Sequence, residues 1–210
     1  MPHTLAIQQA FQHPLLQQIV GNAIELVPEI KHEGLVCTAL AASLRGTQSE
    51  ARRELKKSSR RKVDIYFTQD HTELEAKYHL DFDLPKVSNA VDNFSQVKKK
   101  VQRLGRAGSW NAGEAVIFEL SRLGSGYFLW SICSRGTDAP NRICMETQRT
   151  KWLNGLAVNH QNDVHGHVQA ELARLAGLIA QEMELTVTPL SEIRQGHSVL
   201  FSTLFRRAQG

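Results

Sequence analysis

Two carboxylates and an amine stand at spacings that suit catalysis between Val63 and Tyr78. Asp64 lies in one short apolar run, and Glu75 and Lys77 lie in a second run beyond a polar turn. Alternate residues of a β-strand project to the same face, so Glu75 and Lys77 share a face if the second run is a strand. If the two runs pair as a hairpin, Asp64 approaches both. We therefore expect two acids and a lysine to meet at one point.

Asp64 and Glu75 would favour the binding of a divalent cation, because their carboxylates are oxygen ligands. Mg²⁺ keeps several waters and needs only two or three carboxylates. It makes a water nucleophilic near pH 7 and relieves the charge that builds on a phosphate during hydrolysis. Lys77 is the candidate to hold or deprotonate the attacking water, or to neutralise the phosphate. The alternative is an exposed hairpin whose acids and lysine pair across strands for solubility.

Charge is segregated along the chain, although the net formal charge of the 210 residues is only +4. Residues 45–62 hold eight Lys or Arg and two Glu, and residues 63–85 hold six Asp or Glu and one Lys. Basic stretches attract phosphate backbones, and an acidic group beside them repels phosphate unless a cation is bound. The alternative is that the basic runs are ordinary solvated surfaces. The predicted phosphate contacts are Arg52, Arg53, Lys56, Lys57, Arg60, Arg61, Lys62, Lys98, Lys99, Lys100 and Arg103.

The period of the apolar residues predicts the elements that position this group. The predicted helices cover residues 4–20 with an interruption near Pro14, 29–44, 87–104 and 168–183. The predicted strands cover residues 62–67, 73–80, 115–120 and 127–133. A short helix or exposed arm is expected at 48–60, and a strand or short helix at 198–207. This order predicts one mixed α/β domain with a small, mostly antiparallel sheet flanked by helices.

A resemblance to a known family rests on the same residues. Ten residues separate Asp64 from the Glu-Ala-Lys sequence at 75–77. This pattern resembles the D…(D/E)xK signature of the PD-(D/E)xK nucleases, the restriction-endonuclease-like superfamily. The residue before Asp64 is Val63 where the signature has proline. The resemblance covers about residues 29–135 and implies an αβββαβ core. Residues 142–210 have no counterpart in it, and we expect them to form a C-terminal helical extension of unknown role.

The resemblance implies a metal-dependent DNA endonuclease of restriction, repair or defence type, with Mg²⁺ as the cofactor and Mn²⁺ as a substitute. The implied metal ligands are Asp64, Glu75, the backbone carbonyl of Ala76, and Glu33. The implied catalytic residues are Asp64, Glu75, Lys77 and Glu33. Glu33 enters because many members add a glutamate from a preceding helix, and Glu25 and Glu50 are alternatives for that role. RNA as the substrate and a homodimer are both compatible with the family.

Two readings compete with the nuclease. In one, the chain is a non-catalytic basic nucleic-acid-binding protein whose acidic hairpin is incidental. In the other, it is an adaptor for a partner protein. The histidines at 160, 165 and 167 are dense enough for Zn²⁺, but a loop surface is the favoured reading. Three widely spaced cysteines and the lack of a signal peptide or membrane span predict a cytoplasmic protein.

Overall fold

The computed structural model describes residues 2–27, 30–58, 61–139 and 146–207, apart from the side chains at 2, 54–58, 61–62, 106 and 146. In these residues seven strands form one sheet in the order β1-β2-β3-β4-β7-β5, with β6 paired to β7. Every neighbouring pair is antiparallel except β3 and β4. The strands are β1 (Ala51–Ser58), β2 (Arg61–Phe67), β3 (Glu73–Leu80), β4 (Tyr127–Arg135), β5 (Leu185–Pro189), β6 (Ile193–Gln195) and β7 (Ser198–Arg207).

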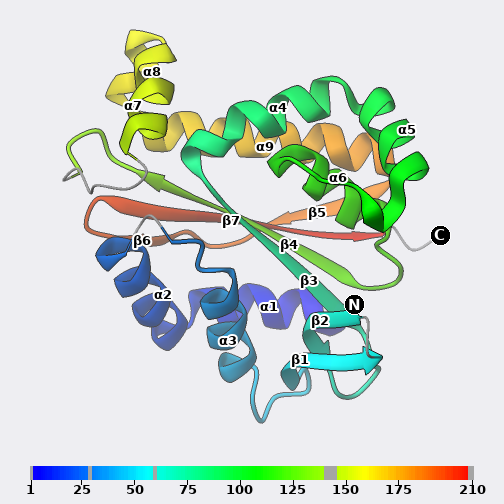
Figure 1. Ribbon diagram of the computed structural model, residues 1–210. Coiled ribbons are helices and arrows are strands. Elements are labelled where there is room, and N and C mark those ends of the chain that lie inside the picture. Colours follow the sequence, from blue (N-terminus) through cyan, green and yellow to red (C-terminus); the bar gives the residue numbers. More distant parts are fainter. Residues whose placement is uncertain (1, 28–29, 59–60, 140–145, 208–210) are drawn as a thin grey trace.

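Helices cover both faces of the sheet (Figure 1). The helices on one face are α1 (Pro2–Gln12), α2 (Pro14–Leu26) and α3 (Glu33–Ser43). The helices on the other face are α4 (Leu84–Asp92), α5 (Phe94–Leu104), α6 (Ala112–Ser121) and α9 (Val164–Met183). The short helices α7 (Glu146–Gly155) and α8 (Val158–Asn162) precede α9. None of the described helices combines the length and apolarity needed to cross a bilayer.

The alternation of side chains along β3 divides the molecule into two cores. Leu74, Ala76 and Tyr78 are buried against α1–α3. Glu73, Glu75 and Lys77 alternate with them and remain half-buried, which places them on the opposite face. The next strand, β4, is buried along most of its length because both of its faces are covered. A central strand of this kind is apolar without alternation.

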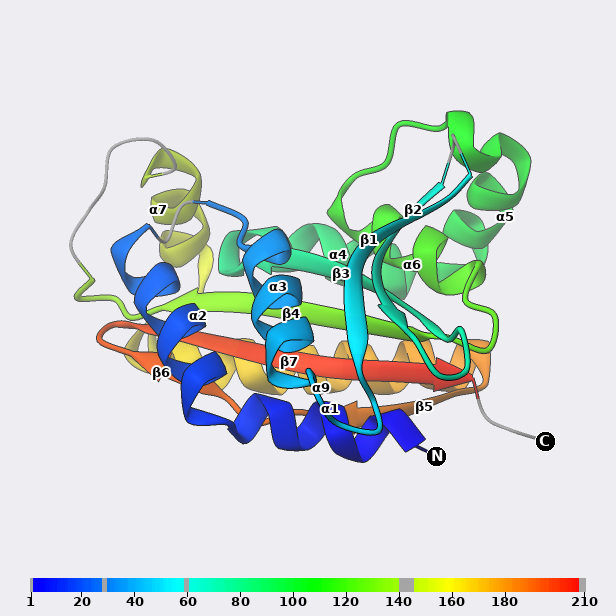
Figure 2. The same ribbon diagram turned by 90° about the horizontal axis from the view of Figure 1, so that it is seen from below.

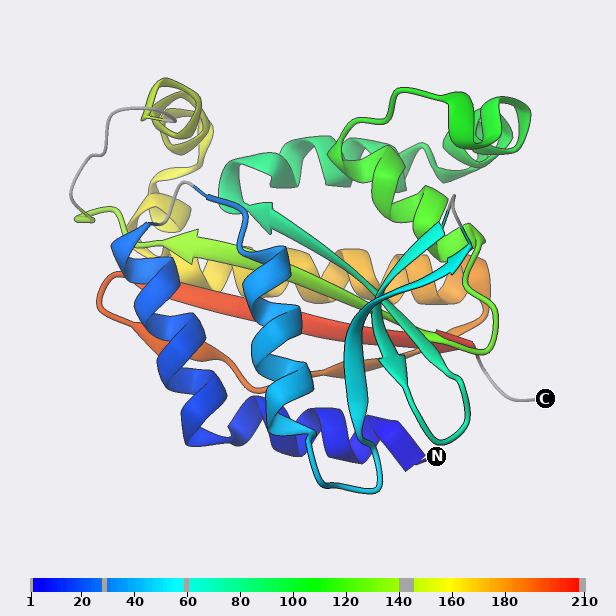
Figure 3. The ribbon, with the colours of Figure 1, turned by 60° about the horizontal axis from the view of Figure 1, so that its bottom comes forward.

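β2 leaves β3 after a short pairing. The partners across the two strands are Ile65 with Leu74 and Tyr66 with Glu73. By contrast, β3 pairs with β4 along its whole length, from Leu74 to Leu80. Figures 2 and 3 show the β1–β2 hairpin bending away from β3. The C-terminal half of β3 therefore has an edge that β2 does not occupy.

Much of the predicted order is confirmed. The chain is mixed α/β, and its sheet is mostly antiparallel. The helix of residues 4–20 is interrupted at Pro14 as predicted, and the strand of residues 73–80 has the predicted bounds. The stripe of residues 87–104 is helical but is divided at Asn93 into α4 and α5. Residues 198–207 form β7.

Three predictions were wrong. Residues 51–58 are the strand β1, because they complete a hairpin with β2 despite their charge. Residues 115–120 belong to helix α6, whose apolar run arises because most of its residues are buried. The C-terminal part is more than a helical extension, since β5, β6 and β7 pair within the same sheet.

Candidate active site at the edge of β3

Two carboxylates occupy the edge of β3 that β2 leaves. The amide of Ala76 donates to Asp64 Oδ2 at 2.8 Å. The amide of Tyr78 donates to Glu33 Oε2 at 3.3 Å. Alternate amides of a strand point to the same edge, so these are consecutive donors that a neighbouring strand would otherwise take. Asp64 from β2 and Glu33 from α3 therefore lie along the same edge, because each supplies the acceptor that a neighbouring strand would otherwise provide.

Lys77 lies beside Glu33 and the carbonyl of Ala76. Its ammonium donates to the carbonyl of Ala76 at 3.0 Å and lies 3.8 Å from Glu33 Oε2. The side chains of Lys77 and Glu33 are 27% and 33% exposed, so solvent reaches the group. The carbonyl of Ala76 points to the same edge as its amide. Four of the predicted site residues, Glu33, Asp64, Ala76 and Lys77, are thus brought together.

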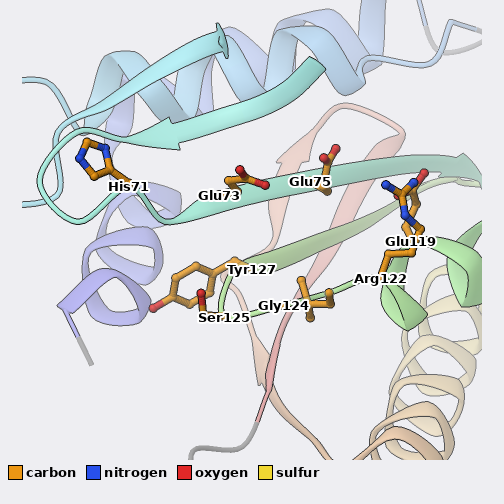
Figure 4. Close-up of a pocket in the computed structure, with 10 residues that line it drawn as sticks. His71, Glu73, Glu75, Glu119, Arg122, Gly124, Ser125 and Tyr127 are labelled. Carbon is orange, nitrogen blue, oxygen red and sulfur yellow. The ribbon is translucent and has the colours of Figure 1, made fainter. Parts of the chain in front are cut away.

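Glu75 projects from β3 on the same face as Lys77 and lines an adjoining cavity of about 230 Å³. Asp64 is on this face as well, because its neighbour Ile65 is fully buried in the opposite core. The cavity is also lined by Glu73, by Glu119 on α6 and by Arg122, which directly follows α6 (Figure 4). Neither Glu119 nor Arg122 was a predicted site residue, because residues 115–120 were expected to form a strand.

The surroundings of Glu33 disfavour its ionised form. Burial raises the pKa of Glu33, and the negative charge of Asp64 raises it further, while Lys77 and the amide of Tyr78 oppose the rise. Two acids close together, with one amine beside Glu33, are an arrangement in which a bound cation stabilises the ionised forms.

A third carboxylate continues the series along β3. Asp83 accepts from the amide of Leu80 at 3.5 Å. Lys31 and Lys86 lie 3.3 and 3.5 Å from its two oxygens. The charge of Asp83 is therefore neutralised by two lysines, and its role is to fix the end of β3 beside the site. The sequence analysis did not single it out.

The oxygen atoms at this site suit a hard cation that keeps several bound waters. The amides of Ala76 and Tyr78 use one oxygen of Asp64 and one of Glu33. Two carboxylates and a backbone carbonyl, completed by waters, are the kind of ligand set that Mg²⁺ accepts. No group of three or more His, Cys, Asp or Glu side chains is arranged to hold a metal ion in the part of the chain that the structure describes.

The other candidate glutamates lie elsewhere. Glu25 accepts from the amide of His197 at 3.1 Å, in the turn between β6 and β7. The backbone carbonyl of Glu50 accepts from Thr68 beyond the far end of β2. Of the three alternatives, Glu33 is the glutamate that contacts Lys77.

The predicted phosphate contacts divide into three groups. Arg52, Lys98, Lys99 and Arg103 are exposed. Arg53 donates to the carbonyl of Gly34 and, at 3.0 Å, to Thr38 Oγ1, so it ties β1 to α3. Lys100 donates to Glu114 at 2.6 Å, which joins α5 to α6. The predicted contacts whose side chains lie outside the described residues are Lys56, Lys57, Arg60, Arg61 and Lys62.

The histidine cluster is divided between two environments. The rings of His160 and His167 lie 4.3 Å apart. His165 instead hydrogen-bonds to Ser134 on β4 at 2.8 Å. Because His165 is engaged with the sheet, the three histidines do not converge on one point.

Searches of models of known protein families, of curated proteins and of solved structures returned no match for this chain.

Proposed function

We propose that this protein is a metal-dependent endonuclease that hydrolyses phosphodiester bonds in DNA at the edge of β3. The observation that carries the proposal is the meeting of Asp64, Glu33 and Lys77 around the peptide of Ala76. The resemblance to the PD-(D/E)xK nucleases is based on the types and the spacing of Asp64, Glu75 and Lys77 along the chain. Their convergence in space is independent support, because the acids come from different elements, α3 and β2.

The order of elements around the site supports the same proposal. Helix α3 precedes the meander of β1, β2 and β3, helices α4–α6 follow, and β4 returns parallel to β3. This sequence of elements is similar to the αβββαβ core that the resemblance implies. The strands β5, β6 and β7 then extend the sheet on the side of β4 away from the site.

Each residue has a role that its position allows. Asp64, Glu75 and the carbonyl of Ala76 would hold the cation, with Glu33 bound to it through water. When bound, Mg²⁺ supplies a nucleophilic water and neutralises charge on the phosphate. The ammonium of Lys77 is placed to orient that water or to stabilise the phosphate as negative charge builds. Exposed cations on α5 and on the β1–β2 hairpin would contact the flanking phosphates without reading sequence. We expect such an enzyme to work in the cytoplasm.

Plasmid cleavage tests this proposal. We expect nicking or linearisation with Mg²⁺ or Mn²⁺ and none with EDTA. Asp64→Asn, Glu75→Gln and Lys77→Met should each reduce the rate by at least about 100-fold, because each removes a group that acts in the transition state. Glu182→Gln and Lys151→Met, which change exposed residues on α9 and α7, are the matched controls and should cleave at the wild-type rate.

A specific observation favours a second candidate, a nucleic-acid-binding protein without catalysis. Asp64 and Glu33 already accept backbone amides, and Lys77 already has partners, so the group is complete as a structural cap. In that case the chain binds labelled DNA in EDTA, and no cleavage of DNA or RNA appears with either metal. Equal rates for wild type and Lys77→Met would also contradict the nuclease, because they would assign the cleavage to a contaminant.

A further inference from the structure

Helix α2 is apolar on two faces, and the fold covers one of them. The core-facing residues of α2, each fully buried, are Leu16, Val20 and Ile24. A second stripe at helical spacing remains exposed, with Leu15 at 46%, Ile19 at 37% and Leu26 at 63%. A helix that is apolar on more than one side is normally buried on more than one side. The exposed residues Leu15, Ile19 and Leu26, which we call the α2 stripe, are therefore a candidate contact surface.

Helix α1 and most of α2, including Leu15 and Ile19, come from a stretch of chain with almost no charge. Residues 1–24 contain no Asp, Glu, Lys or Arg, although such residues make up 22% of the chain. Glutamine and asparagine supply the exposed polar positions, among them Gln18 and Asn22. Glu25 is the first charged residue, and its carboxylate is bound to the turn before β7.

This absence of charge decides between occupants. A nucleic acid needs cations opposite its phosphates, and an interfacial membrane helix typically carries Lys or Arg on its polar face. Residues 1–24 offer neither. In a two-fold dimer the same patch meets itself, so charged side chains close to the axis would face their own copies. A patch that is apolar and neutral avoids that repulsion, in a chain whose net charge of +4 otherwise disfavours self-association.

We propose that the α2 stripe is the self-association surface of this protein, with a second copy of the chain packed against it about a two-fold axis. Figures 2 and 3 place α2 at the side of the molecule opposite the β1–β2 hairpin. This inference does not depend on the proposed nuclease activity.

The size of the helix sets the expected strength. Thirteen residues of α2 span about 20 Å. A helix pair of this length, with the neutral side chains beside it, lies below the roughly 800 Å² per partner of a standard interface. We therefore expect a dissociation constant on the order of micromolar rather than nanomolar.

Analytical ultracentrifugation of the full chain, from about 1 to about 200 µM, tests the inference over the micromolar range. The wild-type mass should rise with concentration from 23.6 kDa towards twice that value. Ile19→Glu should weaken the association by about tenfold or more, since it places a charge against its own copy. Leu178→Glu on α9 is the matched control, because Leu178 has the same 37% exposure; it should associate as wild type does.

Two results would overturn the inference. One is a wild-type mass that stays at 23.6 kDa at every concentration, which would leave the α2 stripe to a different protein. The other is equal weakening by Ile19→Glu and Leu178→Glu. Leu15→Gln, a milder change in the same stripe, keeps the test valid if Ile19→Glu unfolds, and circular dichroism reports the fold of each variant.

Discussion

At the scale of single residues, one Ser-His-Asp group has the composition of a catalytic triad but a structural role. His3 hydrogen-bonds to Ser49 Oγ and to Asp70 Oδ2, each at 2.9 Å, and its ring stacks on Phe67. A hydrolase needs its serine to face the substrate. Here Ser49 is buried, whereas Asp70 is the member that reaches solvent. The set therefore ties α1 to the loop before β1 and to the β2–β3 turn.

His79 makes stability depend on pH. Burial, aided by the charge of Lys31, lowers its pKa to about 4, and its Nδ1 accepts from Trp130 at 3.0 Å. Below about pH 6.5, His79 is protonated in the unfolded chain but stays neutral in the folded protein. The free energy of unfolding should therefore fall between pH 6.5 and pH 4, by up to about 3 kcal/mol.

Urea unfolding at several pH values measures this loss. His79→Asn removes the titration and keeps an acceptor near Trp130, so it should lose less stability than wild type over the same interval. The exposed His13→Asn serves as the control and should follow the wild-type curve. Parallel curves for wild type and His79→Asn would show that another group is responsible for the acid sensitivity.

At the scale of elements, the helices on the α5 side of the sheet pack with one very close approach. An added Cβ on Gly113 would lie 2.5 Å from the Cβ of Ala90 and 2.6 Å from the carbonyl of Lys86. Glycine is required there because the backbones of α4 and α6 nearly touch. Gly177 on α9 is different, since no atom lies within 4 Å of the position that its Cβ would take.

Alanine substitution at these two glycines should change stability in opposite directions. Gly113→Ala should cost about 1–3 kcal/mol, because α4 and α6 must separate. Gly177→Ala should gain about 0.5–1 kcal/mol, because it reduces the entropy of the unfolded chain without a clash. Urea unfolding of both variants provides the measurement. A stabilised Gly113→Ala protein would contradict the close approach of the two helices.

At the scale of the whole molecule, the charged residues of α5 separate into side chains exposed to solvent and one that forms an ion pair with α6. Lys99 is exposed, whereas Lys100 is bound to Glu114, whose pKa it lowers together with the amide of Asn111, against the effect of partial burial. Adjacent lysines therefore have different expected functions, which composition alone does not reveal.

DNA binding measured against salt should distinguish the two lysines. Lys99→Met should reduce the slope of log Kd on log salt by about one and leave stability unchanged, as expected for a lost phosphate contact. Lys100→Met should lower the free energy of unfolding by about 1 kcal/mol, because Glu114 loses its partner. If both variants alter binding alone, the ion pair with Glu114 does not persist in solution.

The sequence predicted those elements whose burial follows a simple period. Strict alternation in residues 73–80 defined β3, and Pro14 marked the boundary between α1 and α2. β1 was missed because Arg and Lys dominate it and its pairing with β2 is a tertiary property. α6 was missed because burial on most sides erases the helical period. Its start was nevertheless signalled by Asn111 and Glu114, which form a capping box.

The candidate site was predictable where spacing along the chain reflects strand geometry, and unpredictable where distant segments meet. Asp64 and Lys77 follow from the hairpin. Glu33 was selected through the family resemblance, and its bond to the amide of Tyr78 needed coordinates. The cavity beside Glu75 could be found only from the position of α6, since Glu119 on α6 and Arg122 directly after it line the cavity.

The carboxylates along β3 also bear on aggregation. A strand edge with unsatisfied amides is a template on which another chain adds a strand. Asp64, Glu33 and Asp83 take the amides of residues 76, 78 and 80, so an incoming strand finds no donors in this stretch. The same side chains therefore make this edge unusable for another β-strand. Variants that remove these acids should consequently be examined for fibril formation as well as for activity.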